Sequence, residues 1–203
     1  MNESLAILDS RFREPIAHLD IGRLEATADN VLITNSDLAL CAANSSFVRF
    51  LEANGGAAGS TADWLGTSVI DRMTKPVSNY YQDAFERLLS TAGTWDHDYE
   101  CHSPDLNRRF HLSCYTLPAS AGLVMTHHLV HEGPHSDVAV AVAEVHVSPE
   151  GFVVQCSHCR KIRNHERHEG WDWVPTLLEP ATSNVSHTFC APCLDHFYPD
   201  LDD

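Results

Sequence analysis

Two cysteine pairs near the end of the sequence constrain the fold more than any other feature. They have the spacings Cys156-x-x-Cys159 and Cys190-x-x-Cys193. Two thiolates separated by two residues can bind the same metal ion, and two such pairs complete a tetrahedral site. A catalytic zinc keeps an open position, which four thiolates do not leave. The pattern therefore predicts a structural zinc site that stabilises the fold, with Cys156, Cys159, Cys190 and Cys193 as ligands.

The distance between the two pairs indicates how the site is assembled. Cys190 follows Cys159 by 31 positions (190 − 159), whereas about 15–20 residues are usual for this pattern. We therefore expect two metal-binding turns on separate pieces of chain, with Trp171 and Trp173 filling the space between them. Zinc is the favoured ion, but an iron–sulfur cluster uses the same four thiolates, so the sequence leaves both open.

Composition restricts the location and the partners of the chain. Of its 203 residues, 43% are hydrophobic, yet no apolar run is long enough to cross a bilayer. The N-terminus lacks the features of a secretory signal, so we expect a cytoplasmic protein without membrane contact. A net charge of −15 disfavours nucleic acid. Four cations follow the first cysteine pair, and we expect them to offset the negative charge of the thiolate site. They are Arg160, Lys161, Arg163 and Arg167.

Hydrophobic periodicity predicts the elements of the N-terminal two thirds. Residues 3–28 have apolar positions at helical spacing, with a kink expected at Pro15. A strand pair, a short helix capped by Asn44, another short helix, a long helix opened by Pro76 and three strands follow. The predicted ranges are 31–34 and 38–43 for the pair, 63–73 for the second short helix, and 95–102, 109–117 and 123–131 for the strands. Residues 138–155 read as a β-hairpin that leads to Cys156.

This order of elements resembles that of PAS sensor domains. The resemblance covers roughly residues 19–132, and residues 31–48 and 99–112 carry it best. It implies an α+β fold in which a PAS-like five-stranded antiparallel sheet curls over flanking helices. A small ligand in the pocket between sheet and helices is left open, because the fold alone names none.

The C-terminal part resembles a four-cysteine motif that follows sensor domains in bacterial signalling proteins. That motif reads Cys-Ser-x-Cys-(Arg/Lys)-Lys, then a tryptophan, then Ser-His-x-x-Cys-x-x-Cys and a final Tyr-Pro. Here its parts are residues 156–161, Trp171, residues 186–193 and Tyr198-Pro199. The expected domains are an N-terminal helix at 1–18, a PAS-like sensor domain at 19–134, and a β-hairpin with a small zinc-ribbon-like unit at 135–203.

Together the two resemblances imply a sensory or protein-interaction module for signal transduction. We expect no enzymatic activity, because a saturated metal site and scattered carboxylates offer no reaction geometry. We expect output through a homodimer or a signalling partner, with Leu8 and Phe12 of the N-terminal helix as the contact surface. A nucleic-acid-binding zinc protein and a thiol-based redox switch are the alternatives.

Two further groups of polar residues are assigned no site. His127, His128, His131 and His135 surround the end of the last predicted sheet strand, where about 13 Å would separate the two that share a face. Asp96, Asp98 and Glu100 alternate along one predicted strand, which indicates a solvated sheet face rather than catalysis. His158 and His187 lie beside the cysteine pairs, and we expect them to support the ligands.

Overall fold

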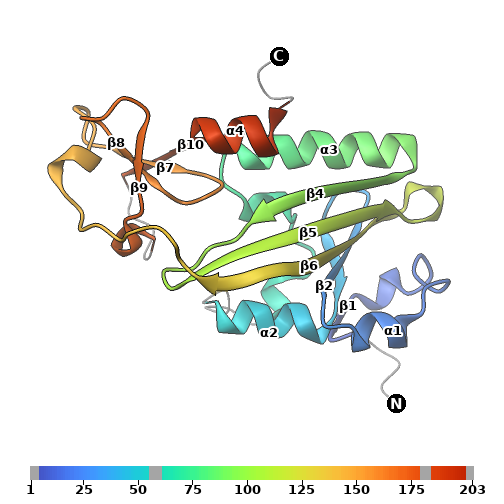
Figure 1. The fold of residues 1–203 in the computed structure, drawn as a ribbon. Helices are drawn as coiled ribbons and strands as arrows, with labels where there is room; N and C mark the ends of the chain where they lie inside the picture. Colours follow the sequence, from blue (N-terminus) through green and yellow to red (C-terminus); the bar gives the residue numbers. More distant parts are fainter. Residues whose placement is uncertain (1–4, 55–60, 179–183, 200–203) are drawn as a thin grey trace. The chain divides into compact units, whose positions relative to one another are not determined.

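The computed structural model describes residues 5–54, 61–178 and 184–199 (Figure 1). Contacts divide the chain into two compact units. The first unit contains residues 1–73, 81–97 and 111–129, and the second contains residues 74–80, 98–110 and 130–203. Three strands and the long helix therefore run through both units. The two units are described separately below.

A six-stranded sheet has the strand order β1-β3-β2-β6-β5-β4. Its strands are β1 (Ile7–Leu8), β2 (Asn30–Asn35), β3 (Leu40–Ala43), β4 (Thr94–Glu100), β5 (Leu106–Thr116) and β6 (Gly122–Pro134). Strand β2 pairs antiparallel with both β3 and β6, in a register that places Ile33 opposite Val124. Gly122 lies where β6 approaches Thr34 so closely that a Cβ atom would overlap the Thr34 carbonyl. The sequence therefore needs glycine at this position.

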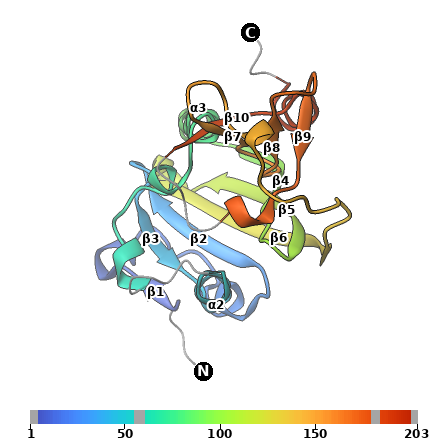
Figure 2. The ribbon, with the colours of Figure 1, turned by 90° about the vertical axis from the view of Figure 1, so that its left-hand side faces the viewer.

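The helices of the first unit follow the expected order. They are α1 (Ile21–Ala26), α2 (Ser45–Ala53) and α3 (Val77–Thr91), with short 3-10 turns at Ser10–Phe12, Thr61–Trp64, Ile70–Arg72 and Pro118–Ser120. Helix α2 packs against β2 (Figure 2). The predicted order of strand pair, short helices, long helix and three strands is confirmed. The helix predicted at 63–73 is instead two separate 3-10 turns.

The core of the first unit explains why β2 is apolar along almost its whole length. Val31, Ile33, Ala42 and Val124 are fully buried and pack in one cluster. Phe85 from α3 lies against Trp95 of β4, with the two rings almost perpendicular. Both faces of β2 are therefore covered, and its residues 31–34 show no alternation of buried and exposed positions.

The predicted N-terminal helix is wrong. Residues 7–8 form β1, which pairs with β3, and the only α-helix before β2 in the described residues begins at Ile21 after the Asp20 cap. Apolar spacing of three to five residues also suits a short strand and a 3-10 turn whose side chains pack on the core, as they do here. Leu8 and Phe12 pack against the core cluster of their own unit. They do not form the exposed apolar stripe on which the predicted contact surface depended.

The second unit contains a four-stranded sheet in the order β10-β7-β8-β9. Its strands are β7 (Val153–Cys156), β8 (Ile162–Asn164), β9 (Gly170–Asp172) and β10 (Val185–Thr188), and helix α4 (Ala191–Phe197) follows β10. Two 3-10 turns lie at Glu144–His146 and Pro175–Leu177. Strands β7 and β8 are antiparallel, whereas β10 joins β7 in parallel.

The predicted hairpin at 138–155 is correct only in its second arm, β7. Its first arm is irregular and ends in the 3-10 turn at Glu144–His146. His146 explains the difference, because its ring is almost fully buried and bonds at both nitrogens. Nδ1 accepts from the backbone N–H of Ala143, and Nε2 lies 3.0 Å from Asp172. These contacts pull residues 143–146 out of an extended conformation. Within the described part of the chain, no helix is long and apolar enough to span a membrane.

Asn44 is the polar residue that holds the first unit together. Its buried side-chain oxygen accepts from the N–H groups of Val31 and Phe47. The hydrogen bond from Phe47 is the predicted N-cap of α2. Its amide donates to the carbonyls of Leu24 and Asp29. One side chain thus satisfies four backbone groups from three parts of the chain.

We predict that Asn44→Ala lowers the free energy of unfolding by about 3 kcal/mol or more. The substitution leaves several buried backbone groups without partners, and each costs about 1–3 kcal/mol. Urea denaturation of the full chain measures the change. Asn79→Ala is the matched control, because Asn79 is exposed on α3, and it should change the stability by less than about 0.5–1 kcal/mol. Equal effects of the two substitutions would contradict the role of Asn44.

Candidate metal centre

The first cysteine pair is formed by a tight turn at the end of β7. Cys156 is the last residue of this strand, and its N–H donates to the carbonyl of Lys161 across the turn. Arg160, which follows Cys159, adopts a left-handed conformation with φ of 65°. This conformation reverses the chain into β8, where Ile162 pairs with Gln155 of β7.

The second pair lies at the start of α4. Cys190 is the N-cap residue, and its carbonyl accepts from the N–H of Cys193 one turn later. The parallel pairing of β10 with β7 places Thr188 opposite Cys156. The backbone N–H of Cys190 also donates to Cys156 Sγ at 3.4 Å. The 31-residue gap is therefore closed by strand pairing.

The four sulfurs are buried and have the spacing that a tetrahedral metal site requires. All lie within 4.8 Å of one another, and Cys190 Sγ lies 3.7 Å from Cys156 Sγ and 3.8 Å from Cys159 Sγ. A zinc–sulfur bond of about 2.3 Å gives a tetrahedral edge of about 3.8 Å, whereas a disulfide requires about 2.05 Å. Each cysteine is less than a tenth exposed, and Trp171 and Phe197 pack around the group. This geometry suits zinc, and the donor set fits the ion.

The thiols interact strongly because they are so close. Hydrogen bonds from Cys159 and the other two thiols lower the pKa of Cys156 far below its ordinary value. The same contacts raise the pKa of Cys159 and Cys193 well above theirs. The pKa of Cys190 is also lowered, so ionisation of two of the thiols opposes that of the other two. Four thiolates at these distances need a dication to balance their charge.

Three other cysteines lie outside the centre. Cys41 and Cys114 are buried, and Cys101 is half-buried. Burial raises the pKa of each of these thiols, most strongly at Cys114. They are therefore inert thiols, and no described cysteine forms a disulfide.

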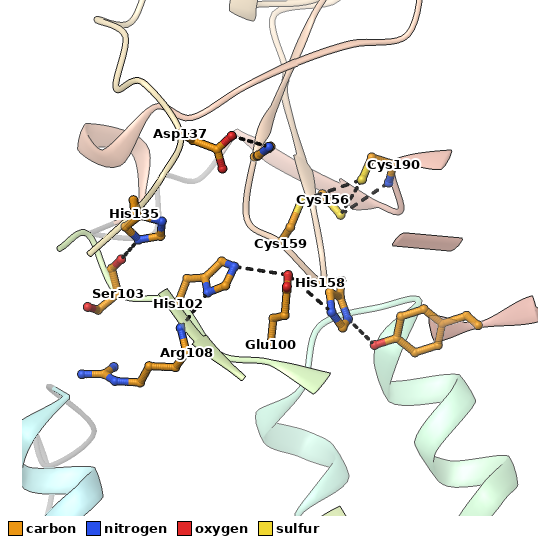
Figure 3. Close-up of polar contacts among 12 residues, drawn as sticks. Glu100, His102, Ser103, Arg108, His135, Asp137, Cys156, His158, Cys159 and Cys190 are labelled. Carbon is orange, nitrogen blue, oxygen red and sulfur yellow. Dashed lines mark hydrogen bonds and ion pairs between the residues drawn. The ribbon is translucent and has the colours of Figure 1, made fainter. Parts of the chain in front are cut away.

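A polar network next to the first cysteine pair was not predicted from the sequence. Its centre is Glu100, at the end of β4, whose carboxylate lies between His102 and His158 (Figure 3). His102 Nε2 is 3.2 Å from Glu100 Oε2, and His158 Nε2 is 3.6 Å from the same oxygen. His158 also lies 3.0 Å from the Tyr198 hydroxyl through Nδ1, and its ring stacks on Phe197.

Burial and charge determine the ionisation of this network. Burial lowers the pKa of His158 to about 4, so its ring is neutral at pH 7. Burial alone would raise the pKa of Glu100, but the hydrogen bond from His102 outweighs it, and the pKa is lowered. Glu100 is therefore a carboxylate whose oxygen lies within 4.8 Å of Cys193 Sγ.

The remaining predicted residues take structural positions. Lys161 pairs with Asp137 at 2.8 Å, and Arg167 pairs with Asp172, so only part of the predicted cation group is available to balance the thiolates. Trp173 is buried against His135 rather than between the cysteine pairs. His127, His128, His131, His135 and His187 belong to neither of the two described groups of His, Cys, Asp and Glu that could hold an ion.

Comparisons with known proteins do not assign the chain to a family. No protein-family model matches it, and no curated protein matches it. Among solved structures, it is similar to the crystal structure of the phage VqmA-DPO complex, with a TM-score of 0.42 and 14% identity. The similarity covers 60% of this chain and 56% of that chain, so the chain spans about half the length of that neighbour. A likeness of this size supports no conclusion about fold or ligand.

We predict that Cys159→Ser weakens zinc binding by at least about tenfold, because a serine hydroxyl is a poor substitute for a thiolate ligand. Competition between the reduced full chain and a chromophoric zinc chelator measures the affinity. Cys101→Ser is the matched control, since Cys101 lies outside the centre, and it should bind zinc like the unmodified chain. Equal zinc affinity of Cys159→Ser and the unmodified chain would rule out Cys159 as a ligand.

Proposed function

We propose that the chain is a PAS-like sensor or protein-interaction module of bacterial signal transduction, with a zinc ion that stabilises its C-terminal part and no catalytic output. The observation that carries the proposal is the burial of four thiols at tetrahedral spacing. When bound, a zinc ion would supply structural cross-linking between β7 and the start of α4. Four sulfurs saturate the ion, so the centre offers no position for a substrate.

The sensor part of the proposal depends on the order of the elements. Strands β3-β2-β6-β5-β4 are neighbours in one sheet, and α2 and α3 lie between β3 and β4 in sequence. The order along the chain, a strand pair, short helices, a long helix and three strands, is the one that the resemblance to PAS domains implies, with β1 added at the edge of the sheet. A ligand in this domain remains part of the proposal only as an unidentified small molecule.

Output through a second copy of the chain is supported by an exposed apolar strip in the second unit. Val138, Val140 and Val142 alternate with alanines along one irregular segment, and their exposed fractions are 83%, 37% and 51%. Ala139 between them bridges to Trp173, and the N–H of Val140 donates to the Trp173 carbonyl. The same strip on a second copy offers a self-complementary apolar surface, as two-fold symmetric dimers require. The proposed location is the cytoplasm, where reduced thiols persist.

The two alternative functions have less support. A nucleic-acid binder would need an open basic surface, but the net charge is −15 and two of the four cations near the centre are paired with carboxylates. A redox switch would need accessible thiolates, and the four cysteines are at most 8% exposed.

Removal of the metal should unfold the C-terminal part while leaving the core of the first unit folded. We predict that a strong chelator greatly increases hydrogen exchange of the amides in β7, β10 and α4. Exchange in β2 and β3 should change little, because their contacts involve no cysteine of the centre. Exchange measured by mass spectrometry on the full chain, with and without zinc, makes this comparison. Unchanged protection of β7 after complete metal removal would contradict a structural role of the metal.

Native mass spectrometry tests the dimer. We predict a dimer for the unmodified chain and a monomer for the double variant Val138→Asp/Val142→Asp, because four buried carboxylates would face one another across the strip. The exposed pair Asn79→Asp/Gln82→Asp on α3 is the control for added charge. A monomeric unmodified chain would end the homodimer proposal and leave a different protein as the partner.

A further inference from the structure

A second group of metal-binding side chains lies beside the structural zinc site and has Cys193 in common with it. A ring nitrogen of His158, a carboxylate oxygen of Glu100 and Cys193 Sγ all lie within 4.8 Å of one another. These are the nitrogen, oxygen and sulfur donors that zinc accepts in proteins. The group draws on three parts of the second unit: the end of β4, the turn after β7, and α4.

The His158 ring nitrogen Nε2 has no hydrogen-bond partner among the described residues, although its side chain is only 1% exposed. Its other nitrogen is held by Tyr198 at 3.0 Å. If the Tyr198 hydroxyl donates, an N–H at Nε2 faces the Glu100 oxygen at 3.6 Å, too far for a hydrogen bond. If Nδ1 donates, a bare lone pair faces a carboxylate. Neither arrangement satisfies a buried polar atom.

His102 fixes the orientation of the Glu100 carboxylate. His102 Nδ1 accepts from the backbone N–H of Arg108 at 3.2 Å, so the neutral ring carries its proton on Nε2. Nε2 then donates to Glu100 Oε2, 3.2 Å away (Figure 3). A buried histidine therefore holds the carboxylate in place beside His158. Support of this kind behind the ligands is a regular feature of metal sites.

Distances and charge agree with a metal ion at this position. Zinc bonds of about 2.0–2.1 Å to nitrogen and oxygen give a tetrahedral edge of about 3.3 Å, close to the 3.6 Å between His158 Nε2 and Glu100 Oε2. Four thiolates around one zinc ion carry a net charge of −2, and the Glu100 carboxylate adds another negative charge next to Cys193. No lysine or arginine forms an ion pair with this carboxylate among the described ion pairs. A second dication would balance the group.

We propose that Glu100, His158 and Cys193 form a second zinc site, which shares the Cys193 thiolate with the four-cysteine site. This inference rests on the proposed function, because Cys193 must already be held as a thiolate by the first ion. The second site has three protein ligands, one of them shared, so it leaves a position for water and binds more weakly than the first. Its occupancy therefore follows the free zinc concentration while the first ion remains bound.

The test is a metal titration of the reduced, metal-free full chain, first with Co²⁺ and then with Zn²⁺. The first equivalent should give the intense sulfur-to-cobalt absorption of a four-thiolate site. A second, weaker equivalent should alter the visible d–d bands, because its ligands include nitrogen and oxygen. Equilibrium dialysis against buffered zinc, followed by elemental analysis, counts the ions independently of the spectrum.

Glu100→Gln and His158→Gln should each weaken the second equivalent by at least about tenfold and leave the first nearly unchanged. Glu166→Gln and His196→Gln are the matched controls, since both residues are exposed in the same unit, and they should retain both equivalents. Glu100→Gln keeps the test valid if His158→Gln misfolds, because Glu100 is the less buried of the two.

The outcomes separate this inference from the proposed function. One equivalent with a four-thiolate spectrum would overturn the second site and leave the structural zinc intact. A second equivalent that persists in both Glu100→Gln and His158→Gln would place the ion elsewhere and overturn the assignment. Absence of any tightly bound metal would overturn both proposals.

Discussion

Four buried thiols that would repel one another when ionised are the constraint on which the second unit depends. Their sulfurs are too far apart for a disulfide and too close for four independent thiolates. Each is buried, so water does not screen their charges. A dication converts this repulsion into attraction, and the free energy of metal binding then becomes free energy of folding. A sheet of four strands, each of only three or four residues, has little core of its own and gains most from such a cross-link.

The negative charge of the thiolate site also makes the nearby carboxylate of Glu100 unusual. A net charge of −2 on a four-thiolate zinc site would repel the Glu100 carboxylate, whose oxygen lies within 4.8 Å of Cys193 Sγ. One hydrogen bond from His102 offsets only part of this repulsion, since a bond to a charged group contributes about 1.5–3 kcal/mol. Positive charge close to the carboxylate would offset the rest. Neutral His158 does not supply that charge.

Local sequence patterns predicted much of the fold and the main site, because they depend on short-range rules. The two-residue spacing of each cysteine pair, the Asn44 cap and the apolar run of β2 are all readable over a few positions. The prediction of an N-terminal helix was wrong because the apolar spacing of these residues suits a strand and turns equally well. The prediction of the first hairpin arm was wrong because the distant Asp172 accepts a hydrogen bond from His146, which no local pattern reveals.

The prediction that Glu100 lies on a solvated sheet face was wrong for a related physical reason. Asp96 and Asp98 alternate with it along β4, and this alternation indicates a solvated face. The strand, however, continues into the second unit, where its last residue meets His102 and His158. Only the final Tyr-Pro of the C-terminal motif hinted at this environment, because Tyr198 is buried and holds the His158 ring. No spacing rule connects residue 100 with residues 158 and 198.

A saturated site and an open site in one unit would respond differently to the same ion. Four thiolates would hold a zinc ion through any ordinary change in free metal, so the first site would determine whether the unit is folded. A site of three ligands with a shared thiolate releases its ion more easily, and the release frees the Glu100 carboxylate at the end of β4. Glu100 is the last residue of β4, a strand of the six-stranded sheet. Occupancy of the second site, unlike that of the first, would then follow the free metal concentration.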